Sequence, residues 1–483
     1  MSETKAKSKF VEQNTIAPVG VNERHGKPRD LFYLWFGVNI MPLTIVTGLL
    51  GPTVFGLNFT WTLVAILGAN AVGSAIMALH SAQGVKLGVP QMLQSRGQFG
   101  SYGSVVVLVV VLLMYVGFLT SILILAGQSM HAATSAVSIN TGIVIATVIT
   151  ALVVAFGYRI IHAFNRWMLP VFGVTLVFVF IWAVLVHHLP AGLFSHGGYT
   201  TAGFVGMFSL AVVWQLSYAP YVSDYSRYMP LSASPSRTFW MTWSGTTVGA
   251  VLVELFGAVV GLVTVGNDAM GQLAKLIPGI AAPVMIVFAI GAIDACVINL
   301  YGPVLTTITL GQTFREKWAP QAGGRLLLTA IWSIGALLLA LFTASSFLAH
   351  YTNFLTVLLY FIAPWSTINL VDYYLVHHAN YDIPSFFRSD GGIYGKFQWD
   401  AVLAYFIAFA AQIPFMNTAY FVGPLFKRMS GVDITWLVGV VVSFAVYYPL
   451  AKYYFKKESA LGVHGSSAAQ TSPGAAASGD ELA

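Results

Sequence analysis

The chain alternates long apolar runs with short polar segments over most of its length. A helix needs about 20 predominantly apolar residues to cross a bilayer core. Runs that meet or approach this length cover residues 31–55, 61–80, 105–129, 143–158, 168–186, 203–222, 239–265, 283–313, 326–342, 347–376, 401–422 and 434–454. The pattern predicts an all-α polytopic membrane protein of about twelve transmembrane helices.

The basic residues between the runs are distributed unevenly. Cytoplasmic loops of membrane proteins carry an excess of Lys and Arg. With the N-terminus inside, the inner loops hold eleven basic residues, namely Lys86, Arg96, Arg159, Arg166, Arg227, Arg237, Arg315, Lys317, Arg325, Arg388 and Lys396. The outer loops hold three, namely Lys275, Lys427 and Arg428. The asymmetry predicts a multi-pass protein of the cell (cytoplasmic or inner) membrane with both termini cytoplasmic.

The two ends of the chain differ from the apolar body. Residues 1–30 are polar and contain six Lys and Arg, without an apolar stretch followed by a cleavage site. Residues 457–483 are rich in Ser, Ala and Gly. We therefore expect a cytoplasmic N-terminal tail, a transmembrane domain over 31–456, and a disordered cytoplasmic C-terminal tail.

Composition narrows the class of protein further. Hydrophobic residues make up 57% of the chain and charged residues 8%, against roughly 45–50% and 25% in soluble domains. The net charge of +6 does not indicate nucleic-acid binding, because the basic residues lie singly or in pairs at the ends of apolar runs. A single cysteine, Cys296, excludes an intramolecular disulfide and a thiolate metal cluster.

Two of the apolar runs, the first and the sixth, contain a proline next to polar residues at matching places in the two halves of the chain. In the first run, Pro42 removes an amide and frees the carbonyl of Val38. In the sixth, Pro220 lies nearer the inner face, so we place the break between Trp214 and Ser217. The two runs cross in opposite directions, which is typical of inverted-repeat transporters with their site between the breaks. Simple kinks in a packed bundle are the alternative interpretation.

Two carboxyl groups lie deep in apolar runs, those of Asp294 and Glu254. Ionisable residues in this setting are costly and usually mark ion or substrate pathways. Asn299 follows Asp294 by five residues, a turn of about 140°, so the two side chains face adjacent directions. A structural polar contact is the alternative role for Asp294. No partner for Glu254 is evident from the sequence.

Sequence signatures of enzymes are absent. The chain has no HExxH, GxSxG or P-loop segment, and two isolated carboxylates do not form a catalytic constellation. We therefore predict that the protein is not an enzyme. A channel is a further alternative, although inverted broken helices suit alternating access better.

Five segments together resemble the nucleobase-cation-symport-1 family, in particular its purine-cytosine permease branch. They are ERHGKPRDLFYLWFGVNI (23–40), HSAQGVKLGVPQMLQSRGQFG (80–100), SDYSRYMP (223–230), DACVINLYGP (294–303) and APWSTINLVDYY (363–374). The resemblance implies a LeuT-like fold of two inverted five-helix repeats, about 31–187 and 203–376, plus two peripheral helices within about 399–455.

The resemblance also implies a substrate site. In the family, aromatic side chains on the third and sixth helices sandwich a flat heterocycle, and polar side chains on helices three and eight bond its edge. Tyr115 matches the third-helix aromatic residue and shares a helix face with Phe118, while Leu119 stands where some relatives have an amide. The sixth-helix position is Trp214 or Gln215. The candidate substrate-binding residues are Tyr115, Phe118, Trp214, Gln215, Asn299 and Asn39.

By the same resemblance, a coupling cation binds near the first break. Family sodium sites use backbone carbonyls of helix one and groups on helix eight. Here the matching positions are Gly37, Val38 and Ile40 with Asp294, a carboxylate that can bind Na⁺ or carry a proton. The ion therefore stays open between Na⁺ and H⁺.

The resulting hypothesis is import of a nucleobase, a cytosine-like or purine-like heterocycle, by cation symport through alternating access. Symport of another small heterocycle, such as allantoin, a hydantoin or a vitamin precursor, is the alternative. The expected partners are the substrate, the coupling cation and the lipid bilayer, with no nucleic acid and no cofactor.

Overall fold

The computed structural model describes residues 18–156, 158–185, 192–263, 266–315, 318 and 320–460. Within them the chain is almost entirely helical, and its β-structure is limited to isolated bridges at Leu57–Gly198 and Asn417–Val422. The helices are α1 (Pro28–Val38), α2 (Pro42–Thr53), α3 (Phe59–Leu87), α4 (Gln91–Phe99), α5 (Val105–Ala133), α6 (Ile139–Phe156), α7 (Tyr158–Leu185), α8 (Thr201–Leu216), α9 (Ala219–Ser226), α10 (Pro235–Val263), α11 (Ala269–Lys275), α12 (Ala281–Phe314), α13 (Ala322–Thr343), α14 (Phe347–Val371), α15 (Trp399–Gln412), α16 (Pro424–Arg428) and α17 (Thr435–Ala460).

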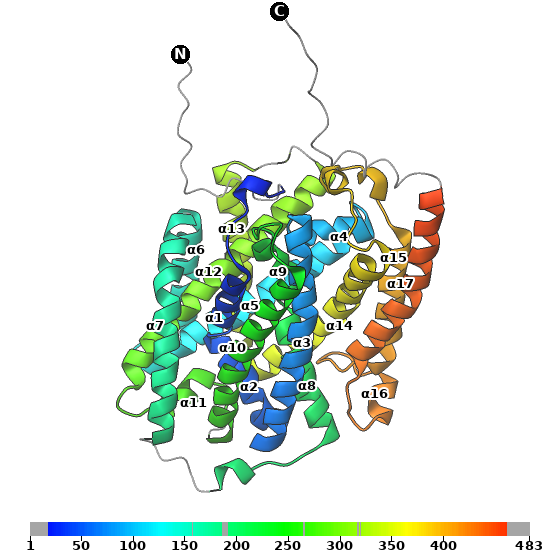
Figure 1. Cartoon of the computed structure of the whole chain (residues 1–483). Coiled ribbons are helices and arrows are strands. Elements are labelled where there is room, and N and C mark those ends of the chain that lie inside the picture. Colours follow the sequence, from blue (N-terminus) through cyan, green and yellow to red (C-terminus); the bar gives the residue numbers. More distant parts are fainter. Residues whose placement is uncertain are drawn as a thin grey trace, which may run out of the picture.

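The predicted apolar runs each have a helical counterpart, and most of these helices are roughly parallel (Figure 1). In the described residues, seven helical stretches are long and apolar enough to cross a membrane, or eight if the bent pair of α1 and α2 is one span. One stretch, 322–376, contains both α13 and α14. The shorter apolar helices α6, α7 and α15 complete the twelve.

Local sequence sets the ends of these helices. The Asn58 side chain accepts a hydrogen bond from the Trp61 amide at 3.0 Å and caps the start of α3. Gly88 ends the same helix with φ of 67°, a left-handed conformation that favours glycine. The prediction for the eleventh run is wrong at its C-terminal end, because α15 stops at Gln412 just before Pro414, which cannot continue the backbone hydrogen bonding.

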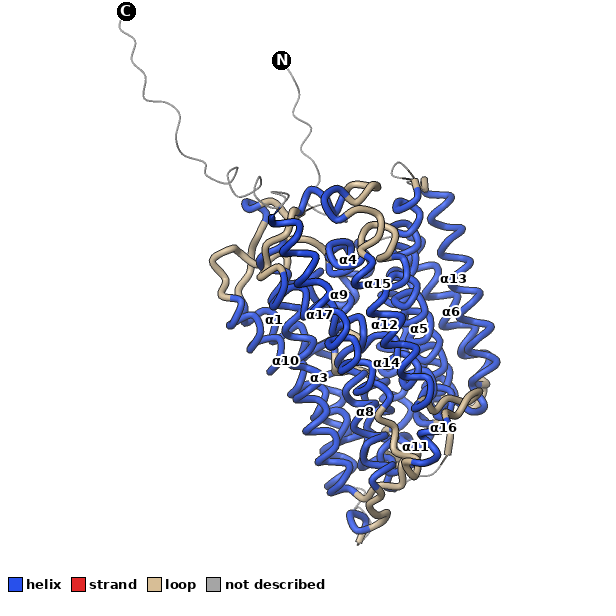
Figure 2. Tube along the Cα trace, turned by 90° about the vertical axis from the view of Figure 1, so that its right-hand side faces the viewer, coloured by secondary structure: helices blue, strands red, loops and turns tan. Residues whose placement is uncertain are grey.

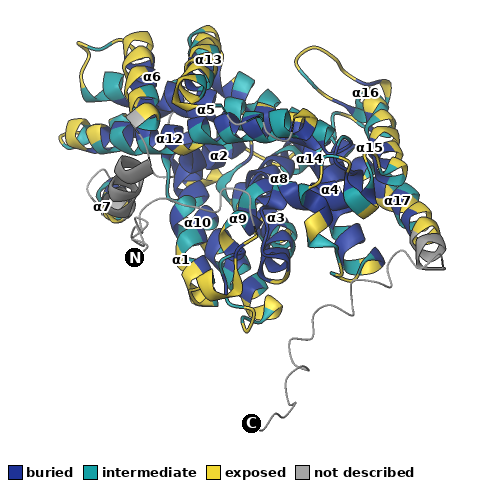
Figure 3. Cartoon of the chain, turned by 90° about the horizontal axis from the view of Figure 1, so that it is seen from above, coloured by how far each residue is buried: buried dark blue, intermediate teal, exposed yellow. Residues whose placement is uncertain are grey.

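The outer surface of the bundle is apolar. On α13, the side chains of Leu327, Ile331, Ile334 and Leu338 are exposed at helical spacing, Leu338 by 62%. Figure 3 shows exposed residues at the rim, on helices such as α6 and α13, around a buried centre. A soluble protein does not expose apolar stripes of this kind, so these faces contact lipid.

Helix α10 lies directly against both halves of the first span. A Cβ at Gly249 would be only 2.6 Å from the carbonyl oxygen of Phe36 on α1, and one at Gly257 only 1.9 Å from that of Ile45 on α2. Glycine therefore lets the helix backbones touch at these positions. The glycines form two GxxxG pairs, Gly245/Gly249 against α1 and Gly257/Gly261 against α2, so each side of the break has one pair.

The first span is broken where Pro42 predicts it. Helices α1 and α2 are bent by 62° across residues 39–41, and Pro42 is the first residue of α2. The Asn39 side chain donates to the Trp35 carbonyl at 2.8 Å. This side-chain hydrogen bond replaces a backbone hydrogen bond that the helix loses at the break.

The sixth span is interrupted more gently. Helix α8 ends at Leu216 and α9 starts at Ala219, with Ser217 and Tyr218 between them still in right-handed helical conformation. The two helices pass as one span of 26 residues. The break lies at the end of the predicted segment, because Pro220 occupies the first turn of α9, where a missing amide costs no hydrogen bond.

The accessory helices α15 and α17 pack on each other at one side of the bundle, next to α14. The described chain starts and α17 ends at the same end of the molecule, as the blue and red ends in Figure 1 show. Figure 2 shows the same bundle from the side, with most of the trace helical. Helix α17 continues to Ala460. Residues 1–17 and 461–483, which include most of both predicted tails, lie outside the described residues.

Candidate functional site

Aromatic side chains from several helices meet beside the two breaks. Tyr115 on α5 stacks on Tyr221 on α9, with ring centroids 5.9 Å apart and an interplanar angle of 23°. Phe118, one turn along α5, meets the edge of Trp214 on α8 at 6.1 Å. Tyr218 lies between Trp214 and Tyr221, about 6 Å from each. The predicted residues Tyr115, Phe118 and Trp214 therefore line one continuous aromatic wall.

Asn39 joins the first break to this wall. Its side-chain oxygen accepts a hydrogen bond from the indole N–H of Trp214 at 2.9 Å, and its side-chain nitrogen donates to the Thr246 hydroxyl on α10 at 3.0 Å. Asn39 and Trp214 are both buried. The two interrupted spans are thus connected directly by a side-chain hydrogen bond.

Gln215, the other candidate on the sixth span, points toward different helices. Its side-chain nitrogen donates to Asn70 on α3 at 2.6 Å, and its side-chain oxygen accepts from the Thr246 hydroxyl at 2.5 Å. Neither partner belongs to the aromatic wall. The structure therefore brings Trp214 together with Tyr115 and Phe118, and places Gln215 in a polar network behind them.

Asn299 lies on α12, which packs closely along α5. Gly302, three residues further, meets the Tyr115 ring, since a Cβ there would be 2.6 Å from a ring carbon. Residues three apart share a helix face. Asn299, which is half-buried and donates to the Ala295 carbonyl at 2.9 Å, therefore lies on the face that α12 turns toward Tyr115.

The proposed cation-binding residues lie on elements that share α7 as a neighbour. Asp294 is half-buried on α12, and one turn earlier Gly291 meets the Phe172 ring of α7. The next residue of α7, Gly173, faces the Ile40 side chain at the first break. There Ile40 donates its amide to the Gly37 carbonyl at 2.9 Å, so Ile40 stands in the unwound segment, and Gly37 and Val38 are the last two residues of α1 before it.

The structure adds residues that the sequence reasoning missed. Tyr218 and Tyr221 belong to the wall, and their spacing from Trp214 by four and seven residues was a usable signal for one helix face. Asn70 was not singled out, because a lone Asn in an apolar run carries little information by itself. Its side chain supplies the missing partner of Glu254, donating to that carboxylate at 2.7 Å.

Three of the five resemblance segments meet at the end of the bundle that holds α4. The amide of Gln91 donates to the Asp224 carboxylate at 2.8 Å, and the side chain of Gln83 donates to Asn369 at 2.9 Å. Arg96 on α4 donates to the Phe386 carbonyl at 2.9 Å, and burial lowers the pKa of its guanidinium from the usual value. The Gln91 contact ties α9, which carries Tyr221, to α4, and the Gln83 contact ties α3 to α14.

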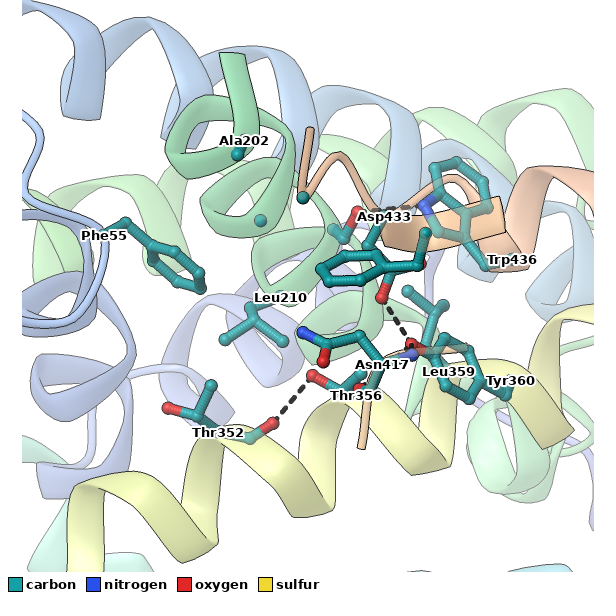
Figure 4. Close-up of a pocket in the computed structure, with 14 residues that line it drawn as sticks. Phe55, Ala202, Leu210, Thr352, Thr356, Leu359, Tyr360, Asn417, Asp433 and Trp436 are labelled. Atoms are coloured by element: carbon teal, nitrogen blue, oxygen red, sulfur yellow. Dashed lines mark hydrogen bonds between the residues drawn. The ribbon is translucent and has the colours of Figure 1, made fainter. Parts of the chain in front are cut away.

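A separate cavity of about 100 Å³ lies between α8, α14 and the start of α17. Figure 4 shows Tyr360 and Asp433 in it, with the phenol donating to the carboxylate, and Trp436 next to them. None of the predicted site residues lines this cavity. Its polar contacts attach the accessory helix α17 to the rest of the bundle.

Comparisons with known proteins place the chain in a family. Residues 18–439 match the family described as permease for cytosine/purines, uracil, thiamine, allantoin. The putative purine-cytosine permease YxlA of Bacillus subtilis is 36% identical over 93% of this chain and 98% of its own length. The purine-cytosine permease fcyB of Emericella nidulans is 25% identical over 88% of this chain and 84% of its own length.

Solved structures support the fold. The inward-facing conformation of Mhp1 has a TM-score of 0.72 at 16% identity, covering 93% of this chain and 96% of that one. The closed conformation of Mhp1 with bromovinylhydantoin bound, described as a nucleobase-cation-symport-1 family transporter, has a TM-score of 0.68 at 18% identity with the same coverage. The predicted LeuT-like fold and the predicted family resemblance are both confirmed. This chain belongs to the family of permeases for cytosine/purines, uracil, thiamine and allantoin, and it is a membrane transporter and not an enzyme.

Proposed function

We propose that this transporter imports a nucleobase, cytosine or a purine, by cation symport. The observation that carries the proposal is the aromatic wall of Tyr115, Phe118 and Trp214 at the junction of two broken helices, in a chain whose relatives are named purine-cytosine permeases. Aromatic faces bind flat heterocycles by stacking, and the stacking tolerates different bases because each offers a π-face.

Trp214 is the better candidate for the sixth-helix stacking residue. Its ring is part of the wall, whereas both polar ends of the Gln215 side chain are already hydrogen-bonded to Asn70 and Thr246. Using Gln215 to bind substrate would leave those buried partners unpaired, at a cost of about 1–3 kcal/mol each. We therefore assign stacking to Trp214 and a supporting role to Gln215.

Substrate entry requires the wall to open. A ring held between two others needs about 7 Å between their planes, two contacts of about 3.5 Å, but Tyr115 and Tyr221 are in direct contact at 5.9 Å between centroids. Stacking of a substrate on this face of Tyr115 therefore requires Tyr221, and with it α9, to move away from α5. Such a movement of one half of a broken span is consistent with alternating access.

Specificity is assigned to hydrogen bonding at the substrate edge. The Asn299 amide can donate and accept, and it lies on the face of α12 that meets Tyr115. For the coupling ion, we propose Asp294 with the backbone of Gly37, Val38 and Ile40. A carboxylate there can take Na⁺ or a proton, and both ions remain candidates.

The test is uptake into proteoliposomes with sodium and pH gradients imposed separately. Labelled cytosine, a purine, allantoin and a hydantoin form the panel, because the family description includes allantoin and the closed Mhp1 structure holds a hydantoin. We expect saturable, gradient-driven uptake of a nucleobase. Uptake of allantoin or the hydantoin alone would select the alternative substrate class.

Two variants test the residue assignments in the same assay. Asn299→Ala should reduce nucleobase uptake about tenfold, the loss of roughly 1.4 kcal/mol of edge bonding. Asp294→Asn should retain substrate binding but lose the gradient dependence. Asp268→Asn, which changes a carboxylate at the start of α11 and keeps its capping oxygen, is the control. Full coupling in Asp294→Asn would refute the ion assignment.

A further inference from the structure

Glu254 is a buried carboxylate without an assigned role. It lies in the middle of α10 with 0% exposure. One carboxylate oxygen, Oε2, accepts the Asn70 amide at 2.7 Å, and the other, Oε1, is buried without a hydrogen-bond partner among the described residues. No lysine, arginine or histidine of that part of the chain forms a salt bridge with it. An ionised carboxylate in such a site is costly, so Oε1 needs a proton or a cation.

A hydrogen-bond chain connects this carboxylate to the substrate site. Trp214 donates to Asn39 at 2.9 Å, and Asn39 donates to Thr246 at 3.0 Å. Thr246 donates to Gln215 at 2.5 Å. From there the Gln215 side chain donates to Asn70 at 2.6 Å, and Asn70 donates to Glu254 at 2.7 Å. The chain crosses α1, α3, α8 and α10, and it includes both interrupted spans.

All five donors of this chain point in the same direction, toward Glu254. The chemistry of its two ends imposes that order, because an indole N–H can only donate and an ionised carboxylate can only accept. Hydrogen bonds in such a row polarise and strengthen one another. A negative charge on Glu254 therefore favours the arrangement in which Trp214 is held by Asn39.

The surroundings favour a proton over a metal cation. A cation would need several free oxygens, but the Asn70 oxygen is already bonded to Gln215, and the Thr47 hydroxyl on α2 is bonded to the Tyr351 phenol at 2.9 Å. The titratable groups that interact electrostatically with Glu254 are the phenols of Tyr218 and Tyr351. The Tyr218 hydroxyl is also buried without a hydrogen-bond partner in the described structure.

We propose that Glu254 is a proton-binding site of the transport cycle, separate from Asp294, and that the chain from Glu254 to Trp214 couples its protonation to the substrate wall. This rests on the proposed symport function. Addition of a proton from water to Oε1 removes the charge toward which all five donors point. If that proton donates into the chain, it opposes the direction that Trp214 imposes, so one link must break. In the proposal this link is the one from Trp214 to Asn39, and its loss frees both side chains.

Infrared spectroscopy of the purified transporter in lipid, titrated between pH 5 and 8 without substrate, tests the site itself. Glu254→Gln keeps the size and hydrogen-bonding capacity of the side chain but cannot titrate. Because Asp294 can also hold a proton, every sample carries Asp294→Asn. We expect this parent to show the carbonyl band of a protonated buried carboxyl, and the parent with Glu254→Gln to lack it. Asp268→Asn should retain the band, and Asn70→Leu should retain it with a changed pH midpoint. A band that persists in Glu254→Gln would overturn the proposal.

Substrate binding tests the coupling. For one linked proton, the affinity of the wild type for its nucleobase can change up to about tenfold per pH unit, and Glu254→Gln should reduce this to less than twofold while still binding. Unchanged pH dependence in Glu254→Gln overturns the coupling, and a Glu254 band that responds to Na⁺ overturns the proton assignment. Absence of nucleobase binding by the wild type would instead count against the proposed function, and the infrared titration would still decide the site.

Discussion

The two interrupted spans are built differently. The first is bent by 62°, and the side chain at its break, Asn39, bonds to α8 and α10. The second continues in helical conformation through Ser217 and Tyr218, and Ser217 only donates to the Trp214 carbonyl of its own helix at 2.7 Å. The side chain at the first break therefore bonds to other helices, whereas that of Ser217 at the second bonds within its own span.

This difference suits two different roles for the first and sixth spans in transport. In the proposed function, the backbone carbonyls at the first break belong to the cation site, and a break fixed by other helices suits that role. In the same proposal, the second span carries the aromatic side chains that separate to admit a substrate, and the Ser217 side chain at its break bonds only within that span. Three pairs of variants test whether the two breaks differ in this way.

Replacement of the side chain at each break should have the largest effect. Asn39→Ala leaves the Trp214 indole and the Trp35 carbonyl without their partners and removes the donor to Thr246, and each buried unpaired group costs about 1–3 kcal/mol. We expect uptake to fall by more than about tenfold. Ser217→Ala, the matched change at the second break, should reduce uptake less than about threefold. Equal losses in the two variants would contradict the proposed difference.

The prolines provide the next comparison. Pro42→Ala restores an amide at the first residue of α2 and allows the helix to reform across the break, since proline in a helix interior costs about 3 kcal/mol. Uptake should fall several-fold, with a weaker cation dependence. Pro220→Ala changes a residue in the first turn of α9, where proline is tolerated, and should have little effect. Initial uptake rates at varied cation concentration measure both variants. A larger loss in Pro220→Ala than in Pro42→Ala would contradict the expectation.

The smallest effect is expected at the hydroxyl that bridges the two breaks. Thr246→Val keeps the shape of the side chain but removes the links to Asn39 and Gln215, so we expect a loss of about 1–2 kcal/mol in thermal stability or substrate affinity. The neighbouring Thr247 has a buried hydroxyl without a hydrogen-bond partner, so Thr247→Val should be neutral or slightly stabilising. Melting curves of the two variants in detergent make the comparison, and indistinguishable curves would argue against a bridge.

Much of the fold could be predicted from the sequence, because bilayer thickness sets the length of each apolar run and a proline interrupts a helix at its own position. The length of the apolar runs was sufficient to predict the spans, and Pro42 was sufficient to locate the first break. The contacts of Glu254 could not be predicted, because Asn70 is 184 residues away in the chain and only the packing of α3 on α10 brings them together. The choice between Trp214 and Gln215 likewise depends on which helices face consecutive residues of α8.

The glycine contacts of α10 have a mechanical consequence. Because its backbone touches α1 on one side of the break and α2 on the other, without side chains between them that could repack, neither half can slide along α10 alone. The helices α1, α2 and α10 then form one rigid unit, in which the contacts of α10 fix the 62° bend between α1 and α2. Any movement of this unit during transport has to carry α1, α2 and α10 together. The hinges must therefore lie in the segments that lead into and out of these three helices.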